Sequence, residues 1–301
     1  MMLFADNARN PHYAKDPAVV RFGGRYLMYY SVPPRPGIDP GWGTAAAESY
    51  DLLNWHYVKE LEITSPAHPK GFCAPGARVI DGKVYLFYQR YGYERSDAVC
   101  LAVSDNGLDF TADPGNPVFQ VPVSDWNCGR AIDADVIRFR DKYFLYAATR
   151  SADYTTQKLV AAVSDGGFSA GNWHLAYDGA VLEPELPWEQ NCIEAPATLV
   201  HNDKLYLFYA GAYNNSPQQI GCAVSSDGIH FERIFREPLL PAGAPGSWNS
   251  SESGHPFAFT DDDGGQYLFF QGNNDNGKTW YLSVKKITWA GDTPQLTEMD
   301  N

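Results

Sequence analysis

The chain has 301 residues, of which 44% are hydrophobic and 14% aromatic, and this is enough apolar side chain for a substantial core. Its formal charge is −13 and its pI is about 4.9, and it contains no basic cluster of the kind that follows a phosphate backbone. Nucleic acid and anionic membrane surfaces are therefore excluded as expected partners, whereas a surplus of carboxylates suits a site for neutral sugars.

From the N-terminus onward, one module recurs five times: a short β-prone run, a turn and an aromatic strand. The paired runs are Asp16–Phe22 with Tyr26–Tyr30, Ala74–Ile80 with Tyr85–Tyr88, Asp133–Phe139 with Tyr143–Tyr146, Ala195–Val200 with Tyr206–Tyr209, and His255–Phe259 with Tyr267–Phe270. The leading tyrosines at 26, 85, 143, 206 and 267 are separated by 58 to 63 residues. A period of this size made of strands predicts a β-propeller.

Each module continues with a strand of small residues, a Gly-containing turn and a further aromatic residue. Examples are Ala102–Gly107 before Phe110 and Ala223–Gly228 before Phe231. Because Asp/Asn-Gly pairs supply the positive φ of tight hairpins, we predict four antiparallel strands per module. The fold prediction is an all-β, five-bladed propeller in a single domain, 1–301, with blades at about 13–65, 72–122, 130–182, 193–240 and 252–301.

The fifth blade is the least regular. Its expected strands are 257–259, 266–271, 280–284 and 286–289, with the N-terminal residues as an alternative outer edge that closes the ring.

The cysteines and the first residues bear on where in the cell the protein is expected. An odd number of cysteines without a Cys-x-x-Cys pair argues against a disulfide framework or a zinc site; they are Cys73, Cys100, Cys128, Cys192 and Cys222. The opening residues lack the basic and apolar regions of a signal peptide, and no apolar run approaches the ~18 residues of a membrane span. We therefore expect a cytoplasmic protein, and the sequence does not indicate an oligomeric state.

Three acids occupy equivalent places at the starts of the innermost strands. Asp16 begins blade one, Asp133 begins blade three, and Glu194 lies at the head of blade four. Because inner strands of a propeller are radial, their ends converge on one axial pocket, where mutual repulsion raises at least one pKa. Glycoside hydrolysis needs this asymmetry, with one acid to protonate the leaving oxygen and one carboxylate to activate water or attack carbon. The alternative for each acid alone is a strand cap that bonds nearby amides.

These strand starts resemble those of five-bladed propeller glycosidases. Asp16-Pro, Ala74-Pro, Ile132-Asp and Glu194-Ala-Pro are closest to glycoside hydrolase family 43, with families 32 and 117 related. The resemblance implies that Asp16 is the general base, Asp133 the residue that orients the acid and tunes its pKa, and Glu194 the general acid. It also implies inversion at the anomeric carbon and substrates such as arabinofuranosides and xylosides.

Two departures from the family pattern bear on the site. Phe72-Cys73-Ala74-Pro75 stands where the family usually has Trp-Ala-Pro, so the resemblance does not supply the family's stacking contact at this position. Asp135 follows Asp133 by two residues and competes for the tuning role, because on a regular strand the two share a face; the alignment with Asp16 favours Asp133.

His255 and Glu252 precede blade five. In family 43 a histidine in the position of His255 resembles an axial ligand, direct or through water, to calcium or another ion; the alternative is a neutral histidine bonded to backbone or water. No cofactor is required, so such a calcium would be structural. We place Glu252 on a loop, where it binds sugar hydroxyls, substitutes as the acid, or is merely solvated.

Other residues are candidate substrate-binding groups. Arg130 lies three residues before Asp133 and either holds Glu194 or a sugar hydroxyl, or is a surface residue. Trp248 lies in a loop between blades and either stacks on a sugar or wedges the blades apart. Three further residues end second strands in equivalent places: Gln89, Arg150 and Gln271.

The sequence therefore favours a glycosidase that removes a terminal residue from a small oligosaccharide. The alternatives on the same scaffold are a retaining β-fructosidase, an anhydrogalactosidase-like enzyme and a phosphorolytic enzyme. A sugar-binding or protein-binding propeller without catalysis is a further alternative, and it would not need three axial acids.

Overall fold

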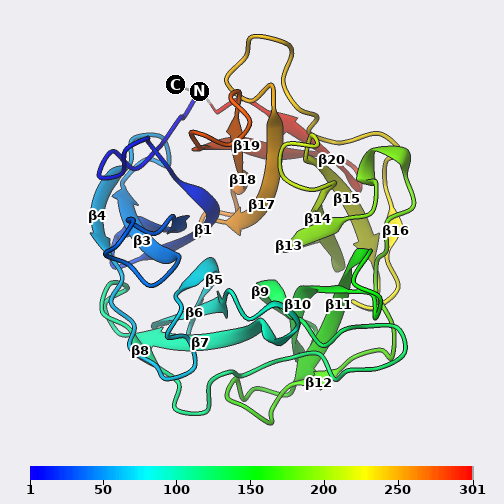
Figure 1. Cartoon of the computed structure of the whole chain (residues 1–301). Coiled ribbons are helices and arrows are strands. Elements are labelled where there is room, and N and C mark those ends of the chain that lie inside the picture. Colours follow the sequence, from blue (N-terminus) through cyan, green and yellow to red (C-terminus); the bar gives the residue numbers. More distant parts are fainter. Residues whose placement is uncertain (300–301) are drawn as a thin grey trace.

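A computed structural model describes residues 1–299 and shows a five-bladed propeller around one central axis (Figure 1). The last expected blade extended to residue 301, and its final two residues lie outside the described part. Each blade is a four-stranded antiparallel sheet whose strands follow one another in chain order. The predicted fold class is confirmed.

The strand bounds are as follows. Blade one contains β1 (Lys15–Phe22), β2 (Arg25–Val32), β3 (Gly43–Ser49) and β4 (His56–Glu60), and blade two contains β5 (Phe72–Ile80), β6 (Lys83–Arg90), β7 (Ala98–Ser104) and β8 (Thr111–Ala112). Blade three contains β9 (Ile132–Phe139), β10 (Lys142–Arg150), β11 (Gln157–Ser164) and β12 (His174–Leu175). Blade four contains β13 (Ile193–His201), β14 (Lys204–Gly211), β15 (Gln219–Ser225) and β16 (Glu232–Arg233). Blade five contains β17 (Glu252–Thr260), β18 (Gln266–Asn273), β19 (Tyr281–Ala290) and β20 (Thr293–Thr297).

The ring closes at blade five, partly with the N-terminal residues. Residues 281–290 form one strand rather than the two short ones expected from the sequence. The second half of β19 pairs with β20, while the first half pairs with Phe4, whose N–H donates to Leu282 O at 2.9 Å and whose carbonyl accepts from Leu282 N at 2.8 Å. The expected fourth strand at 286–289 is therefore wrong, because the outer edge is β20, whereas the alternative of an N-terminal contribution is present along the first half of β19.

Aromatic residues of the second strands hold neighbouring blades together. Tyr29 of blade one donates its hydroxyl to Gly107 O of blade two at 2.8 Å, and Tyr146 of blade three donates to Gly228 O of blade four at 2.7 Å. Both glycines have positive φ, +77° and +82°, and a Cβ at Gly107 would lie 2.4 Å from Leu27. The repeated Asp/Asn-Gly turns thus fasten one blade to the next as well as turning the chain.

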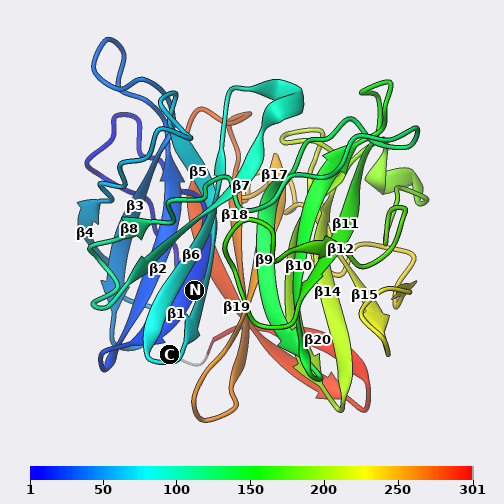
Figure 2. The ribbon, with the colours of Figure 1, turned by 90° about the horizontal axis from the view of Figure 1, so that it is seen from below.

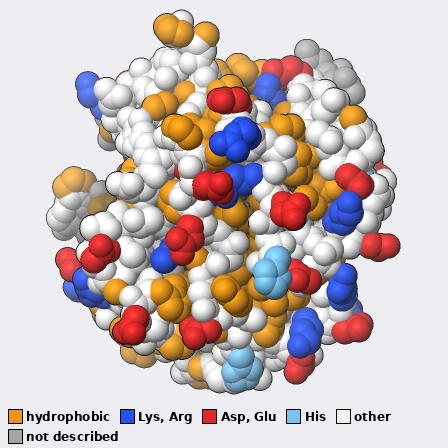
Figure 3. All heavy atoms as spheres, turned by 90° about the vertical axis from the view of Figure 1, so that its right-hand side faces the viewer, with side chains coloured by type: hydrophobic (Ala, Val, Ile, Leu, Met, Phe, Trp, Pro, Cys, Tyr) orange, Lys and Arg blue, Asp and Glu red, His pale blue; other side chains and the backbone are white. Residues whose placement is uncertain are grey.

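Only two helical turns are present in residues 1–299, the 3₁₀ segments η1 (Glu94–Ser96) and η2 (Pro187–Glu189). No helix of the described chain is long and apolar enough to cross a membrane. On the side of the molecule shown in Figure 3, lysine and arginine side chains are interspersed with aspartate and glutamate.

The five inner strands β1, β5, β9, β13 and β17 run along the axis and pack against one another around it. Seen from the side, the strands span the thickness of the molecule (Figure 2). Short hairpins join each inner strand to its neighbour at one end, whereas the loops that lead from one blade to the next feed the inner strands at the other end. The second end is where the acids lie.

Candidate active site

A cavity of about 250 Å³ opens on the axis where the inner strands begin. It brings together seven of the predicted site residues: Asp16, Gln89, Arg130, Asp133, Arg150, Glu194 and His255. The other lining residues are Lys15, Trp42, Cys73, Tyr91, Ile132, Gln157, Tyr213 and Asn214. The volume is below the ~300–1,000 Å³ of common ligand pockets, so the cavity suits a small ring rather than a long chain.

A β-bulge near the start of every inner strand aims these side chains. In each blade the register between the first and second strands shifts at this point. The bulged residue has a positive φ: 53° at Asp16, 46° at Ala74, 54° at Asp133, 51° at Ala195 and 41° at His255. A non-glycine residue in this region costs of order 1 kcal/mol, so the surrounding contacts must hold it there. Glu194 lies one residue before its bulge, as its offset in the sequence predicts.

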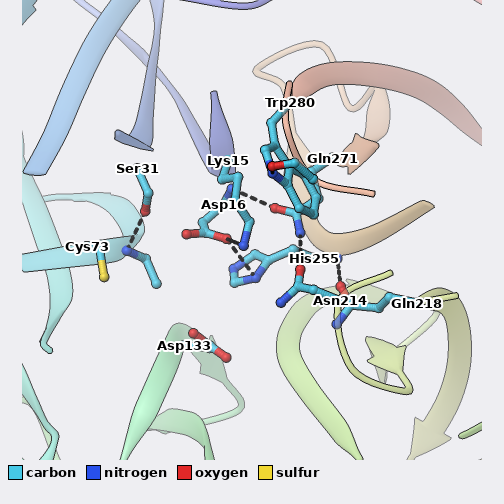
Figure 4. A network of polar contacts seen from close by, with 12 residues as sticks. Lys15, Asp16, Ser31, Cys73, Asp133, Asn214, Gln218, His255, Gln271 and Trp280 are labelled. Carbon is cyan, nitrogen blue, oxygen red and sulfur yellow. Dashed lines mark hydrogen bonds and ion pairs between the residues drawn. The ribbon is translucent and has the colours of Figure 1, made fainter. Parts of the chain in front are cut away.

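Side chains from the preceding blade hold four of these bulges by accepting their backbone N–H groups. The acceptors are Gln271 for Asp16 (3.0 Å), Ser31 for Ala74 (2.7 Å), Gln89 for Asp133 (3.0 Å) and Gln218 for His255 (3.1 Å). Three of these bonds appear in Figure 4, in which Asp133 lies at the end of its strand opposite Asp16. Gln89 and Gln271 were expected to bind substrate; the side-chain oxygen of each accepts a backbone N–H, and of the two only Gln89 lines the cavity.

Asp16 lies between two basic side chains. Its Oδ1 is 3.1 Å from His255 Nδ1 and 3.9 Å from Lys15 Nζ (Figure 4). Burial acts to raise the pKa of Asp16, but His255, Lys15 and a hydrogen bond with Ser31 outweigh it and lower the pKa below its usual value. Burial lowers the pKa of His255 itself. A neutral imidazole still offers Asp16 a hydrogen bond, so Lys15 supplies the lasting positive charge, and Asp16 is a carboxylate near neutral pH.

Asp133 has the opposite environment. Burial, then the charges of Glu194 and Asp16, raise its pKa well above the usual value, and Arg130 and Lys15 only partly oppose this. The protonated form of Asp133 is therefore favoured at pH values where an exposed aspartate is already ionised.

Glu194 is held by two amides. Gln157 Nε2 donates to Oε2, and Gln218 Nε2 donates to Oε1 at 2.7 Å. Gln157 in turn accepts from Arg130 Nη1 at 3.2 Å and from Arg150 Nε at 2.9 Å. The predicted direct contact between Arg130 and Glu194 is thus replaced by a glutamine bridge, which fixes the orientation of the Glu194 carboxyl.

Three predicted substrate-binding residues lie outside the cavity lining. Glu252 is the first residue of β17 rather than a loop residue; it is fully buried and accepts from Gln271 Nε2 at 2.7 Å and from Asn215 N at 2.7 Å. Gln271 is also fully buried, between the Asp16 amide and Glu252. Trp248 packs on Phe270 with ring centroids 5.8 Å apart, in the apolar cluster between blades four and five. Trp248 therefore packs between two blades, which was the alternative expected from the sequence.

The surroundings of His255 do not fit a directly bound calcium ion. Calcium prefers six to eight oxygen ligands, whereas the imidazole Nδ1 here faces Asp16 and the backbone N–H is bonded to Gln218. Within residues 1–299, no group of three or more His, Cys, Asp or Glu side chains is placed to hold a metal ion. The described residues therefore supply no ligand set for the expected axial ion, and the proposed reaction includes no step through a metal.

Several lining residues were not singled out from the sequence. Lys15 is adjacent to Asp16 and lies over the Trp280 ring at 4.5 Å, and Gln157 links two arginines to Glu194. Asn214 reaches the cavity from the loop after β14. A signal was available only for Lys15, a cation directly beside a candidate catalytic acid.

Glycosidases use a pair of carboxyl groups at the scissile bond, and three carboxylic acids lie together at one end of this propeller axis. The chain matches the sequence profile of Glycosyl hydrolases family 43 over residues 8–294 and belongs to that family. It is a glycoside hydrolase by this membership.

Solved structures share the whole fold at low sequence identity. A thermostable family-43 glycoside hydrolase has a TM-score of 0.75 at 18% identity, covering 96% of this chain and 95% of that one. An endo-1,4-β-xylanase from Bacteroides thetaiotaomicron has a TM-score of 0.73 at 21% identity, covering 95% and 94%. An α-L-arabinofuranosidase from Lactobacillus brevis has a TM-score of 0.71 at 16% identity, covering 95% and 94%.

Proposed function

We propose that the chain hydrolyses the terminal glycosidic bond of a small oligosaccharide, of the arabinofuranoside or xyloside kind, with inversion. The observation that carries this proposal is the divergence of two carboxyl pKa values in one cavity, with Asp16 lowered and Asp133 raised. Acid–base catalysis near neutral pH needs one group that keeps its proton and another that has lost it.

In this proposal Asp16 acts as the general base. It accepts a proton from water as the water oxygen bonds to the anomeric carbon. Glu194 gives its proton to the leaving oxygen as the glycosidic bond breaks, so one water is consumed and two hydroxyl groups are formed. Asp133 and Glu194 share one retained proton, which Asp133 holds in the free enzyme and Glu194 holds when it acts as the acid, and Gln157 and Gln218 orient the Glu194 carboxyl.

The cavity supports the choice of a terminal residue. Its volume of about 250 Å³ accommodates a small ring. Further along the inner strands, Arg78 of β5 bonds to Asp135 Oδ1 of β9 at 2.7 Å and to Val136 O at 2.6 Å, and none of these residues lines the acid cavity. The limited volume of the cavity therefore favours a single terminal ring beside the acids.

The test compares wild type with Glu194→Gln and Asp16→Asn on a panel of nitrophenyl furanosides and pyranosides, with the exposed Glu62→Gln as the matched control. We expect both site variants to lose about 10²–10⁴-fold in kcat/KM and the control to keep it. The anomer of the first-formed product, followed by NMR, decides between inversion and the retaining alternative. A Glu194→Gln enzyme that keeps its rate would remove Glu194 from the role of acid.

A phosphorolytic enzyme is the second candidate, because Lys15, Arg130 and Arg150 all line the cavity. It predicts that cleavage depends on inorganic phosphate and releases a sugar phosphate, whereas hydrolysis proceeds in phosphate-free buffer.

A further inference from the structure

Three cationic side chains line the axial cavity, and they differ in their partners. Lys15 lies 3.9 Å from Asp16, and Arg130 Nε lies 3.1 Å from Asp97 Oδ2. Arg150 is paired with no carboxylate of the described residues 1–299; its single side-chain hydrogen bond there runs from Nε to Gln157 Oε1 at 2.9 Å. A positive charge thus faces the cavity without a counter-charge of its own.

The Arg150 guanidinium is held in a fixed orientation. Its central carbon lies 4.4 Å from the ring centroid of Tyr154 and 5.6 Å from that of Tyr213. Because Nε is committed to Gln157, the two terminal nitrogens are the groups left to meet a ligand. Two aromatic contacts and one amide keep this planar fork from collapsing onto the wall.

The Arg150 guanidinium lies close to the proposed acid, Glu194. Gln157 touches both Arg150 and Glu194, so a group bound by Arg150 lies one side chain away from the proposed proton donor. A neutral hydroxyl would accept a hydrogen bond from Arg150 but would leave its charge uncompensated in a half-buried cavity. A carboxylate matches the two parallel N–H groups and neutralises the charge, and such pairs are roughly twice as strong as neutral ones.

We propose that Arg150 is a specificity-determining residue that binds a carboxylate on the substrate, so that the sugar accepted in this cavity is a uronic acid in place of the neutral pentose named above, while the proposed hydrolysis is unchanged. The inference rests on the proposed glycosidase function for its meaning in catalysis, but its binding component is measured separately. Free phosphate is the competing oxyanion, but Lys15 and Arg130 are already paired with carboxylates, which leaves Arg150 as the one unpaired cation of the described cavity lining for it.

The experiment is isothermal titration of D-glucuronate against D-glucose and of D-galacturonate against D-galactose, with inorganic phosphate as a third ligand. Within each pair only the group at C6 changes, from carboxylate to hydroxymethyl. The proteins are wild type, Arg150→Met, which keeps the apolar stem, and Arg150→Lys, which keeps the charge without the fork. Arg95→Met is the matched control, because Arg95 also lies over the Tyr154 ring, at 4.9 Å, and is exposed.

We expect wild type to bind at least one acid about tenfold or more tightly than its neutral partner. Arg150→Met should bring the two within about twofold while neutral sugar still binds, Arg150→Lys should be intermediate, and Arg95→Met should match wild type. The proposal is overturned if no acid is preferred, if the preference survives in Arg150→Met, or if phosphate alone shows the dependence on Arg150, which would indicate phosphorolysis.

The same proteins are then assayed with nitrophenyl hexuronides and the matching hexosides. Arg150-dependent hexuronate binding without hydrolysis of any glycoside would support the role of Arg150 and count against the proposed function. Hydrolysis of a neutral glycoside without a preference for the uronic acid would support the proposed function and count against the role of Arg150.

Discussion

The two ends of the propeller axis are built by the same five strands, yet they carry different chemistry. One end holds the cavity with Asp16, Asp133 and Glu194. The other holds a cavity of about 420 Å³ lined mainly by aliphatic and aromatic side chains, including Val79, Val200 and Phe259, with Arg21 and Asp262 at its rim. The larger cavity lacks the cluster of acids, so size alone does not identify the site.

Asp133 and Asp135 show where the change occurs. Asp135 Oδ1 pairs with Arg78 at 2.7 Å, and its Oδ2 accepts from Thr198 N at 2.7 Å and from Thr198 Oγ1 at 2.6 Å. Asp133, two residues earlier, has Glu194 and Asp16 as its main electrostatic neighbours. The bulge between them ends the regular alternation, so the expectation that they share a face is wrong. A buried carboxyl with satisfied oxygens is structural, and one among like charges is reactive.

The sharpest test of this contrast is Asp133→Asn. Asparagine tolerates the left-handed backbone of this position and removes only the ionisable group. We expect kcat/KM to fall about 10²–10⁴-fold. Because the raised pKa of Asp133 makes wild type lose stability as pH rises above 3.8, the Tm of the variant should rise relative to that of wild type as pH increases from that value. A variant that is both inactive and less stable at pH 8 would make Asp133 structural like Asp135.

Asp135→Ala should do the opposite. It leaves Arg78 without its carboxylate and Thr198 N without an acceptor, so the free energy of unfolding should fall by about 3–5 kcal/mol. Urea unfolding of the single variant and of Arg78→Met/Asp135→Leu measures this, and the double variant should recover much of the loss. Equal losses in the two proteins would show that the aliphatic pair cannot replace the ionic one.

Glu252 gives the next effect, since it supports the Asp16 bulge through Gln271. Burial is the main cause that raises its pKa from 4.5 to about 7. Its neutral form is therefore favoured in the folded state, and wild type should lose up to about 3 kcal/mol of stability as pH rises from 4.5 to 7 and no more above that. Glu252→Gln should flatten this part of the stability–pH curve; a parallel curve would show that Glu252 does not titrate there.

The smallest effect belongs to the far end of the axis. Val200→Thr, at the rim of the larger cavity, should leave kcat/KM within about twofold of wild type. A larger change in kcat/KM would mean that the two ends are coupled through Arg78 and Asp135.

Much of the fold and the central acids could be predicted because they follow from repetition. A recurring β-prone run followed by an aromatic run marks the first two strands of each blade, and the spacing of the tyrosines gives the number of blades. Equivalent positions on radial strands then bring Asp16, Asp133 and Glu194 to one place, and no detailed packing is needed for that conclusion.

Contacts between blades could not be predicted in this way. Gln271 reaches Asp16 across 255 positions of sequence, and Gln157 reaches Glu194 across 37. Whether a residue such as Glu252 or Trp248 faces the cavity or a neighbouring sheet depends on loop paths that have no repeat. The bulges were also hidden, because Ala74 and Ala195 adopt positive φ without being glycine.

These two alanines have a consequence for how the fold acquires new reactions. They occupy the same bulged position as Asp16, Asp133 and His255. In blades two and four the residue before the bulge lines the cavity instead, Cys73 in one and Glu194 in the other. One backbone bend can therefore present either of two successive residues to the ligand, so a functional group can be moved by one position along the chain without rebuilding a loop.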